Sequence, residues 1–271
     1  MGEIAMIKKS EIVDAGKRTI QFLFPIFLVL VIWEIVARAN IVPSFLFPAP
    51  SAVFERAIRL MQPPNYLFFH HAYKSMYRLA AGFGLCAGIG IPIGIAMGMR
   101  STAYKFFTPL LSVMLPIPSI AWAPIVILWI GLGDLTCIIV VFLTGIFPVV
   151  YNVSTGVRSV SQVNIWAAQS MGAGTRDVFL KVLLPGALPY ILAGLKLSAG
   201  GGWRALVAAE MLSATAYGLG YMIFEARTFF AVDTMFAGVM SLSVFGFLLE
   251  RFLFGEIENR TVKKWGMLKQ F

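Results

Sequence analysis

Long apolar runs separated by short polar segments dominate the hydrophobic pattern of the chain. Six runs are long enough, or nearly so, to cross about 30 Å of hydrocarbon as helices. They cover residues 19–37, 76–98, 107–130, 135–157, 186–212 and 234–254. Helices are expected throughout, because lipid-exposed backbone must not leave its polar groups unpaired. The pattern therefore predicts an all-α polytopic membrane protein with six transmembrane helices and no substantial second domain.

Composition agrees with this fold class. Of 271 residues, 59% are hydrophobic and 13% are charged, whereas about 25% charged is typical of soluble domains. The net charge of +9 comes from short basic clusters between apolar runs, as in cytoplasmic membrane loops, so no nucleic-acid partner is expected. Cys86 and Cys137 lie inside apolar runs without zinc-ligand spacing and are expected to be small buried hydrophobes.

The basic residues orient the spans. With the N-terminus inside, most of the 22 Lys and Arg residues fall in inner segments. The positive-inside rule then places both termini in the cytoplasm of a bacterial or archaeal cell. The first run is interpreted as an uncleaved anchor, although Ala37-Arg38-Ala39 resembles a signal cleavage site. The expected segments are a cytoplasmic stretch (1–18), the first helix with an outer loop (19–75), a five-helix core (76–254) and a cytoplasmic tail (255–271).

The outer loop contains a short amphipathic segment. Ser51 is a plausible N-cap, because prolines at positions 43, 48 and 50 exclude an earlier helix start. The apolar residues Val53, Phe54, Ala57, Ile58 and Met61 then share one side. This segment is either a helix lying on the membrane surface or an ordinary packed loop helix.

The second and third spans carry packing and breaking signals. Gly84 and Gly88 are four residues apart, and so are Gly90, Gly94 and Gly98, a spacing that lets another helix approach closely. The third span contains prolines at positions 109, 116, 118 and 124, which predict a broken or kinked helix. Such a break is tolerated beside protein or a wet cavity, so it indicates either a solute pathway or a kink that serves packing.

The fifth span carries ionisable residues at membrane depth. Lys196, Arg204 and Glu210 surround the triplet 200–202 of glycines. On a continuous helix Lys196 and Glu210 fall within about 40° of each other, although three glycines can unwind the helix. These side chains either line a pathway or form an internal ion pair with another span, such as the one that holds Glu34. The predicted pathway residues are Pro118, Trp122, Lys196, Gly201, Trp203, Arg204 and Glu210.

The inner loop 162–185 is polar and amphipathic. A short helix is expected from about residue 162 to 171, followed by a turn at Gly172-Ala173-Gly174. Thr175 is expected to cap a second helix that ends before the fifth span at Pro185 and Pro189. Its apolar stripe comprises Val178, Phe179, Val182 and Leu183. The unit is either a docking surface for another protein or an interfacial helix among lipid headgroups.

The spacing of this loop resembles the cytoplasmic EAA loop of permease subunits from ABC importers. Ala167-Ala168 is followed by three residues and Gly172, and nine further residues lead to Val182-Leu183-Leu184-Pro185. Trp166 stands where the motif opens with an acidic residue, and Val182 stands in place of Ile. The segments "LFPAPSAVFERAI", "PIPSIAWAPIVILWIGLGD" and "WRALVAAEML" extend the resemblance to the branch that imports nitrate, bicarbonate, sulfonates and taurine.

The resemblance implies a six-span permease that pairs with a second copy or a close paralogue. It also implies a separate ATPase docked on the loop and an extracytoplasmic solute-binding protein. ATP and Mg would belong to the ATPase, and no phosphate-binding loop is found in this chain, so a translocation subunit without its own cofactor is expected. The residues assigned to ATPase coupling are Ala167, Ala168, Gly172, Thr175, Arg176, Asp177, Phe179, Lys181, Leu184 and Pro185.

The expected cargo is a small anion, because Lys196 and Arg204 would stabilise negative charge in a low-dielectric pathway. One alternative is a stand-alone secondary transporter, although the two halves of the chain show no convincing repeat. The other is an intramembrane enzyme. His70 and His71 form the only histidine pair, without metal-site spacing, and a boundary or loop role is expected for them.

Overall fold

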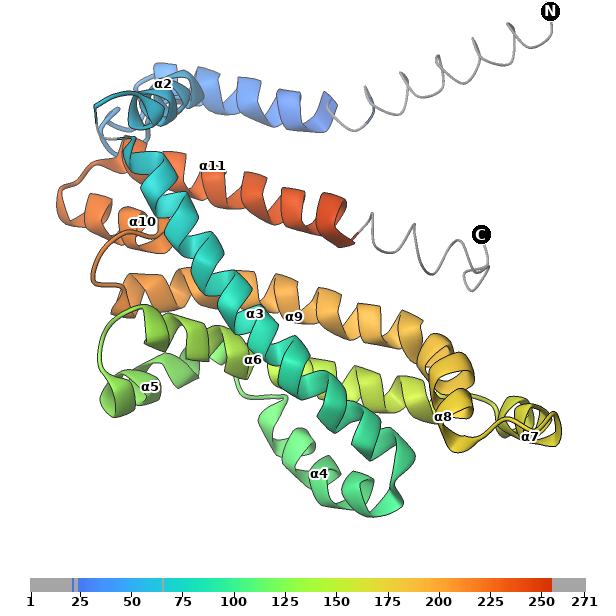
Figure 1. The fold of residues 1–271 in the computed structure, drawn as a ribbon. Helices are drawn as coiled ribbons and strands as arrows, with labels where there is room; N and C mark the ends of the chain where they lie inside the picture. Colours follow the sequence, from blue (N-terminus) through green and yellow to red (C-terminus); the bar gives the residue numbers. More distant parts are fainter. Residues whose placement is uncertain (1–20, 22–23, 65, 255–271) are drawn as a thin grey trace, which may run out of the picture.

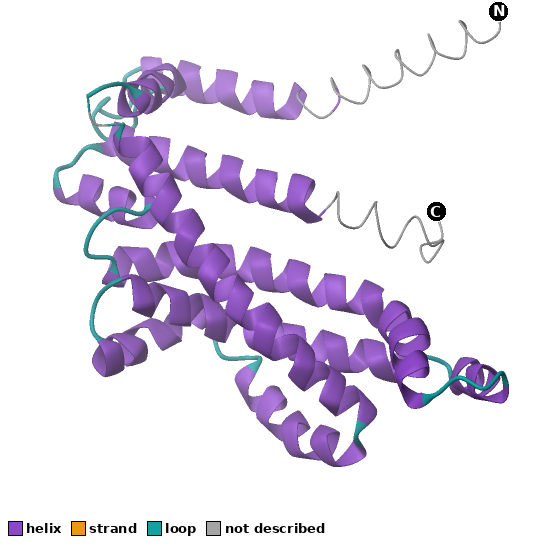
Figure 2. Ribbon diagram, in the orientation of Figure 1, coloured by secondary structure: helices purple, strands orange, loops and turns teal. Residues whose placement is uncertain are grey.

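The computed structural model describes residues 21, 24–64 and 66–254, and these residues are helical or in short loops, without a strand (Figures 1 and 2). The first helix is described over residues 24–38. It is followed by α2 (Pro50–Met61), α3 (Leu67–Met99), α4 (Ser101–Met114), a 3₁₀ turn (Ser119–Ala121), α5 (Trp122–Ile130), α6 (Asp134–Ser159), α7 (Gln162–Ser170), α8 (Thr175–Val178), a π-helical turn (Phe179–Leu183), α9 (Leu184–Ser213), α10 (Leu219–Thr228), α11 (Val232–Leu248) and a second π-helical turn (Leu249–Phe254).

The all-helical prediction is confirmed, while the count of six spans is not. Within the described residues, four helices are long and apolar enough to cross a membrane: Leu67–Met99, Asp134–Ser159, Thr175–Ser213 and Val232–Arg251. A fifth crossing exists if α4 and α5 together form one span, bent by 88°. The first predicted span lies partly outside the described residues. The predicted terminal segments 1–18 and 255–271 lie wholly outside them.

The third predicted span is broken at the position of its central prolines, as the sequence predicts. Helix α4 ends at Met114, and the chain resumes as a helix only at Ser119. Pro116 and Pro118 lie between these points and lack the N–H groups that would continue the helical hydrogen bonds. Figure 1 shows α4 projecting away from the other helices.

Helix α6 lies between α3 and α9 and forms the centre of the bundle. Glycines on α3 let α6 approach closely, because a Cβ at Gly90 would lie 2.9 Å from a Val149 methyl carbon and one at Gly94 would lie 2.6 Å from Val153 Cβ. The predicted packing role of this glycine series is therefore confirmed. Gly84 and Gly88 have nothing within 4 Å in the described chain, so the same role for them stays a prediction.

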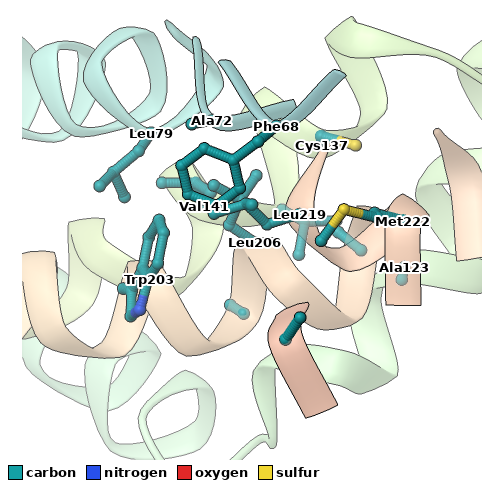
Figure 3. Packing of buried hydrophobic residues seen from close by; sticks show 14 of the residues in the cluster. Phe68, Ala72, Leu79, Ala123, Cys137, Val141, Trp203, Leu206, Leu219 and Met222 are labelled. Atoms are coloured by element: carbon teal, nitrogen blue, oxygen red, sulfur yellow. The ribbon is translucent and has the colours of Figure 1, made fainter. Parts of the chain in front are cut away.

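The main apolar core joins α3, α6, α9 and α10 near one end of the bundle. Phe68, Leu79, Val141, Trp203 and Leu206 are among its buried members (Figure 3). Helix association in lipid gains little from the hydrophobic effect and depends on close van der Waals contact. This core therefore stabilises the bundle by its fit.

Helix α2 packs against α11 and is a loop helix with a buried face. Val53, Ala57 and Leu60 are buried, whereas Phe54 and Ile58 are exposed. The predicted cap is wrong, because α2 begins at Pro50 after Ala49.

Ser51 instead holds α2 to the first helix. Its hydroxyl donates to Glu34 Oε1 over 2.8 Å, and its backbone N–H donates to Glu34 Oε2 over 3.0 Å. Glu34 also pairs with Arg38, whose Nε lies 2.6 Å from Glu34 Oε1.

The loops gather at two ends of the bundle. Helices α7 and α8 lie at one end, while α2, α5 and α10 lie at the other (Figure 1). This grouping is the one that the orientation prediction requires. The orientation itself stays a prediction.

Candidate functional site

The polar loop at the end of α6 is a structured unit. Ser161 caps α7 by accepting a hydrogen bond from the N–H of Val163 at 3.3 Å. At the other end Gly172 has φ +85°, the left-handed conformation that favours glycine. The N–H of Ala173 reaches Ala168 O at 3.0 Å and that of Gly172 reaches Gln169 O at 2.9 Å. These two bonds form a Schellman motif, which gives a physical reason for the alanine–glycine spacing of the loop.

The second half of the loop continues directly into the fifth predicted span. Helix α8, the π-helical turn and α9 form one helical run from Thr175 to Ser213. The predicted separation at Pro185 and Pro189 is therefore wrong. In the π-helical turn the N–H of Leu184 bonds to Phe179 O, and this wider turn directly precedes Pro185, whose ring would clash with a carbonyl of a regular α-helix.

The predicted cap at Thr175 is also wrong. Gly174 is the N-cap of α8 and Thr175 is its first residue, with no side-chain cap hydrogen bond. The predicted apolar stripe faces the bundle, where Val178 is buried and Phe179 is half-buried.

Three large apolar side chains at the tip of the loop are exposed in the described chain. Val163 is 65% exposed, Trp166 is 60% exposed and Met171 is 83% exposed. Arg176 in the following helix is also exposed, and Lys181 pairs with Asp177 across one helical turn at 2.7 Å. We call Val163, Trp166, Met171 and Arg176 the loop-tip surface. Sequence reasoning missed Val163 and Met171, and it treated Trp166 only as a departure from the motif.

The remaining predicted coupling residues lie around this surface or just beyond it. Ala168 is buried by the turn and Ala167 is exposed. Leu184 and Pro185 are half-buried at the start of α9.

A groove of about 510 Å³ runs along α9 in the membrane region. Lys196 and Arg204 line it, separated by two helical turns with Gly200 between them, and Trp203, Leu249 and Glu250 contribute to its walls. Lys196 Nζ lies 3.8 Å from Glu250 Oε1, and both side chains are exposed. The glycine triplet does not unwind α9, which is continuous from Leu184 to Ser213.

The other predicted pathway residues of α9 are more enclosed. Trp203 is buried and its Nε1–H donates to Leu242 O at 3.2 Å. Gly201 faces α6, where a Cβ would lie 3.5 Å from the Thr144 methyl carbon.

Glu210 does not lie in the groove, and its prediction as a pathway residue does not fit the structure. The residue is 1% exposed, and its Oε1 lies 2.7 Å from Nη1 of Arg78, which is completely buried. Ser75 donates to the same carboxylate at 2.8 Å, and the N–H of Gly220 donates to Oε2 at 2.9 Å. Glu210 therefore forms an internal ion pair, which was the alternative prediction. Its partner is Arg78 on α3, and the helix that holds Glu34 is not involved.

Arg78 extends this network to α6. Its Nη2 lies 2.6 Å from Asp134 Oδ1, and Lys74 Nζ lies 2.8 Å from Asp134 Oδ2. We call Lys74, Ser75, Arg78, Asp134 and Glu210 the buried charge network, although Lys74 and Asp134 reach its partly exposed edge. His71 adjoins it, with Nδ1 2.9 Å from the backbone of Gly218. His71 therefore lies inside a spanning helix and helps to hold the α9–α10 loop.

The break between α4 and α5 borders a small cavity. Its volume is about 140 Å³, and Met114, Ser119, Trp122, Thr144 and Phe147 are among its lining residues. Pro118 is the residue that precedes the 3₁₀ turn. The structure therefore brings Trp122 to a cavity beside the break, next to Pro118, and places it apart from the groove residues Lys196 and Arg204.

Several apolar helices, a broken span and a structured polar loop at one end are the features of a polytopic membrane protein. Residues 90–254 match the family model described as "Binding-protein-dependent transport system inner membrane component". The chain belongs to this family of transport permeases and is a permease subunit of an ABC importer.

Relatives cover most of the chain. It is 36% identical to the taurine transport system permease protein TauC of Escherichia coli, over 82% of each chain. It is 32% identical to the putative aliphatic sulfonates transport permease protein SsuC of Bacillus subtilis, over 88% of this chain and 84% of that one. The nitrate import permease protein NrtB of Synechocystis is 30% identical over 83% of each.

The fold is also similar to a solved structure. An inward-facing form of the MetNI methionine ABC transporter matches with a TM-score of 0.63 at 18% identity, over 74% of this chain and 99% of that one. At this identity the match supports the fold alone.

Proposed function

We propose that this permease couples to a separate ATPase through the loop-tip surface and imports a small anionic solute such as a sulfonate, nitrate or bicarbonate. The observation that carries the proposal is the uncovered Trp166 and Met171 on a loop with EAA spacing. Exposed apolar patches indicate interaction sites, and Trp and Arg are the residues most often dominant in protein interfaces.

The helical continuity of the loop with α9 would allow movement of the loop to reach the membrane region. Helix α8 continues without a break into α9, so displacement of the loop tip would move the helix that lines the groove. The Schellman motif at Gly172 fixes the local backbone where α7 ends. The coupling role proposed for Thr175, Arg176, Asp177, Phe179, Lys181, Leu184 and Pro185 rests on this continuity. The role proposed for Ala167, Ala168 and Gly172 rests on the EAA spacing of the loop.

The proposed pathway follows the groove along α9 and the break between α4 and α5. Lys196 and Arg204 supply positive charge to the groove, and a cation in a low-dielectric site attracts an anion. The names of the relatives support this cargo class, because nitrate, bicarbonate and sulfonates are all anions and taurine carries a sulfonate group. Pro118, Trp122, Gly201 and Trp203 remain in the proposed pathway, whereas Glu210 is left out.

The proposed assembly contains a second permease, two sites for ATPase subunits and an extracytoplasmic solute-binding protein. Exposed apolar side chains such as Phe24, Phe27 and Ile35 on the first helix would face lipid or this second permease. We place both termini and the loop-tip surface in the cytoplasm, following the distribution of Lys and Arg.

The test is co-purification from the native host in mild detergent, with mass spectrometry of the bound proteins. A phosphate-loop ATPase is expected with the unchanged chain and is expected to be lost with Trp166→Ala and with Arg176→Ala. Phe229→Ala is the matched control, because Phe229 is an exposed aromatic residue at the opposite end of the bundle. If no ATPase co-purifies while the chain alone moves solute into liposomes, the protein is a secondary transporter and the proposal fails.

The cargo is tested separately, by uptake of labelled taurine, an alkanesulfonate, nitrate and bicarbonate in cells that contain the whole transporter. Arg204→Gln is expected to lower uptake of the anionic cargo without loss of the ATPase. Lys105→Gln removes an exposed cation outside the groove and is expected to leave uptake unchanged.

A further inference from the structure

Helix α4 buries few of its side chains in the described chain. Leu111 is its only buried residue, and α4 packs chiefly against α3 and α6. At its far end the chain turns by 88° into α5, beside the cavity that Ser119 lines. A helix with few buried contacts and a break at one end can move as a rigid body about that break.

A side-chain stack joins this helix to the end of α6, in addition to the apolar contacts of Leu111 with Val150. The guanidinium carbon of Arg158 lies 4.0 Å from the centroid of the Tyr104 ring, in the geometry of a cation–π interaction. The described residues provide no carboxylate partner for Arg158, although it is exposed. The planar guanidinium therefore uses the ring of α4 as its defined partner.

Arg158 also lies next to the coupling loop along the chain. It is in the last turn of α6, and Ser161, three residues later, caps α7. A cavity of about 390 Å³ lies between the α3–α4 turn, the end of α6, α7 and the π-helical turn, lined by Ser101, Arg158 and Gln162 among others. This open space leaves the loop room to move relative to α4, so a side chain that spans from α6 to α4 can carry that movement.

We propose that Arg158 and Tyr104 are positioning residues that transmit movement of the coupling loop to α4 and to the break at residues 115–118. The inference rests on the proposed function, because the movement is supplied by the ATPase. Loss of the stack would leave ATP hydrolysis running while the cavity beside the break no longer changes its access.

The experiment measures access to that cavity in the purified complex with its ATPase. Ser119→Cys introduces a thiol at the break, and its reaction rate with a small charged methanethiosulfonate is measured without nucleotide and in the vanadate-trapped state. Cys86 and Cys137 are completely buried, and the chain without Ser119→Cys serves as the labelling control. A rate that differs between the two states is expected in this background.

Arg158→Met and Tyr104→Leu are expected to retain the ATPase and its hydrolysis but to lose the nucleotide-dependent difference in rate. Tyr104→Phe keeps the ring face and is expected to restore the difference, which a general loss of packing would not explain. An unchanged difference in Arg158→Met and Tyr104→Leu overturns the inference, and so does the absence of any difference in the unsubstituted background.

The failure of the proposed function has a different signature. In that case no ATPase co-purifies even with the unsubstituted chain. If both substitutions at the stack release the ATPase, the two residues act in docking and the transmission role is overturned.

Discussion

Replacing Glu210 by glutamine tests whether the buried charge network holds α3, α6, α9 and α10 together at the end of the bundle opposite α7. The substitution preserves the size of the side chain and removes its charge. Oε1 of Glu210 accepts from Arg78 and Ser75, and Oε2 accepts from the N–H of Gly220. A glutamine has one oxygen and one NH₂ group, so its NH₂ group must face a donor whichever way the amide is turned.

The magnitude follows from burial. Removal of one partner from a buried ion pair costs about 3–5 kcal/mol of stability. Arg78 retains Asp134 through Nε at 3.0 Å and Nη2 at 2.6 Å, so its charge does not become unpaired. The cost for Glu210→Gln is therefore expected at the lower end, about 3 kcal/mol, which corresponds to a fall in Tm of about 6–12 °C for a chain of this size.

The assay is thermal unfolding of the purified protein in mild detergent, with unfolding monitored by size-exclusion chromatography or by tryptophan fluorescence. Glu55→Gln is the matched control, because Glu55 pairs with Arg59 at 2.5 Å and both side chains are more than half exposed. A surface ion pair of this kind contributes about 0–1 kcal/mol to the free energy of unfolding. A double-mutant cycle with Arg78→Gln then isolates the pair, and the double variant is expected to lose less than the sum of the single losses. A Tm change for Glu210→Gln no larger than that of Glu55→Gln would refute the reasoning.

Three further predictions concern packing, backbone strain and orientation. Gly94→Ala is expected to destabilise the detergent-solubilised protein by about 1–3 kcal/mol, because its Cβ would overlap α6, whereas Gly88→Ala, which meets nothing within 4 Å, should be neutral in thermal unfolding. Gly172→Ala should lower ATPase co-purification through strain of about 1–2 kcal/mol at positive φ, while Gly174→Ser, at φ −72°, should retain it; equal loss in both would contradict the strain argument. Met171→Cys should react with an impermeant thiol reagent only in inside-out membrane vesicles stripped of the ATPase, and labelling in intact cells would reverse the proposed orientation.

The sequence predicted the break of the third span and the turn after α7, because both depend on neighbours in the chain, although it misplaced the N-caps of α2 and α8. Prolines 116 and 118 remove hydrogen-bond donors at the position where the span breaks, and Gly172 adopts the positive φ that a helix C-terminus often requires. Periodicity also found the glycine face of α3 but could not distinguish Gly94, which meets α6, from Gly88, which does not. That distinction depends on which side of α3 another helix occupies.

The misassignment of Glu210 has the same origin. Lys196 and Glu210 lie on similar sides of a continuous α9, as the helical angle predicts, yet Lys196 is exposed and Glu210 is buried. Helix α10 turns back onto the C-terminal end of α9, where the N–H of Gly220 donates to Glu210. Arg78 is 132 residues away in the sequence. A helical wheel gives the direction of a side chain but not the neighbour at that height along the helix, so the sequence left the choice between pathway and ion pair open.

The distribution of strong contacts indicates where the bundle can move. Helices α3, α6 and α9 are joined by close glycine contacts along their length and by the buried charge network. The glycine contacts permit little sliding because they are sterically tight. The charge network permits little sliding because breaking it leaves an uncompensated buried charge. Helix α4 has neither kind of contact and ends at a break. Alternating access in this permease is therefore expected to leave α3, α6 and α9 as one block within a subunit. The changes in access would then arise from α4 and α5 and from rotation of whole blocks against each other, which is the type of movement that a loop rigidly continuous with α9 can drive.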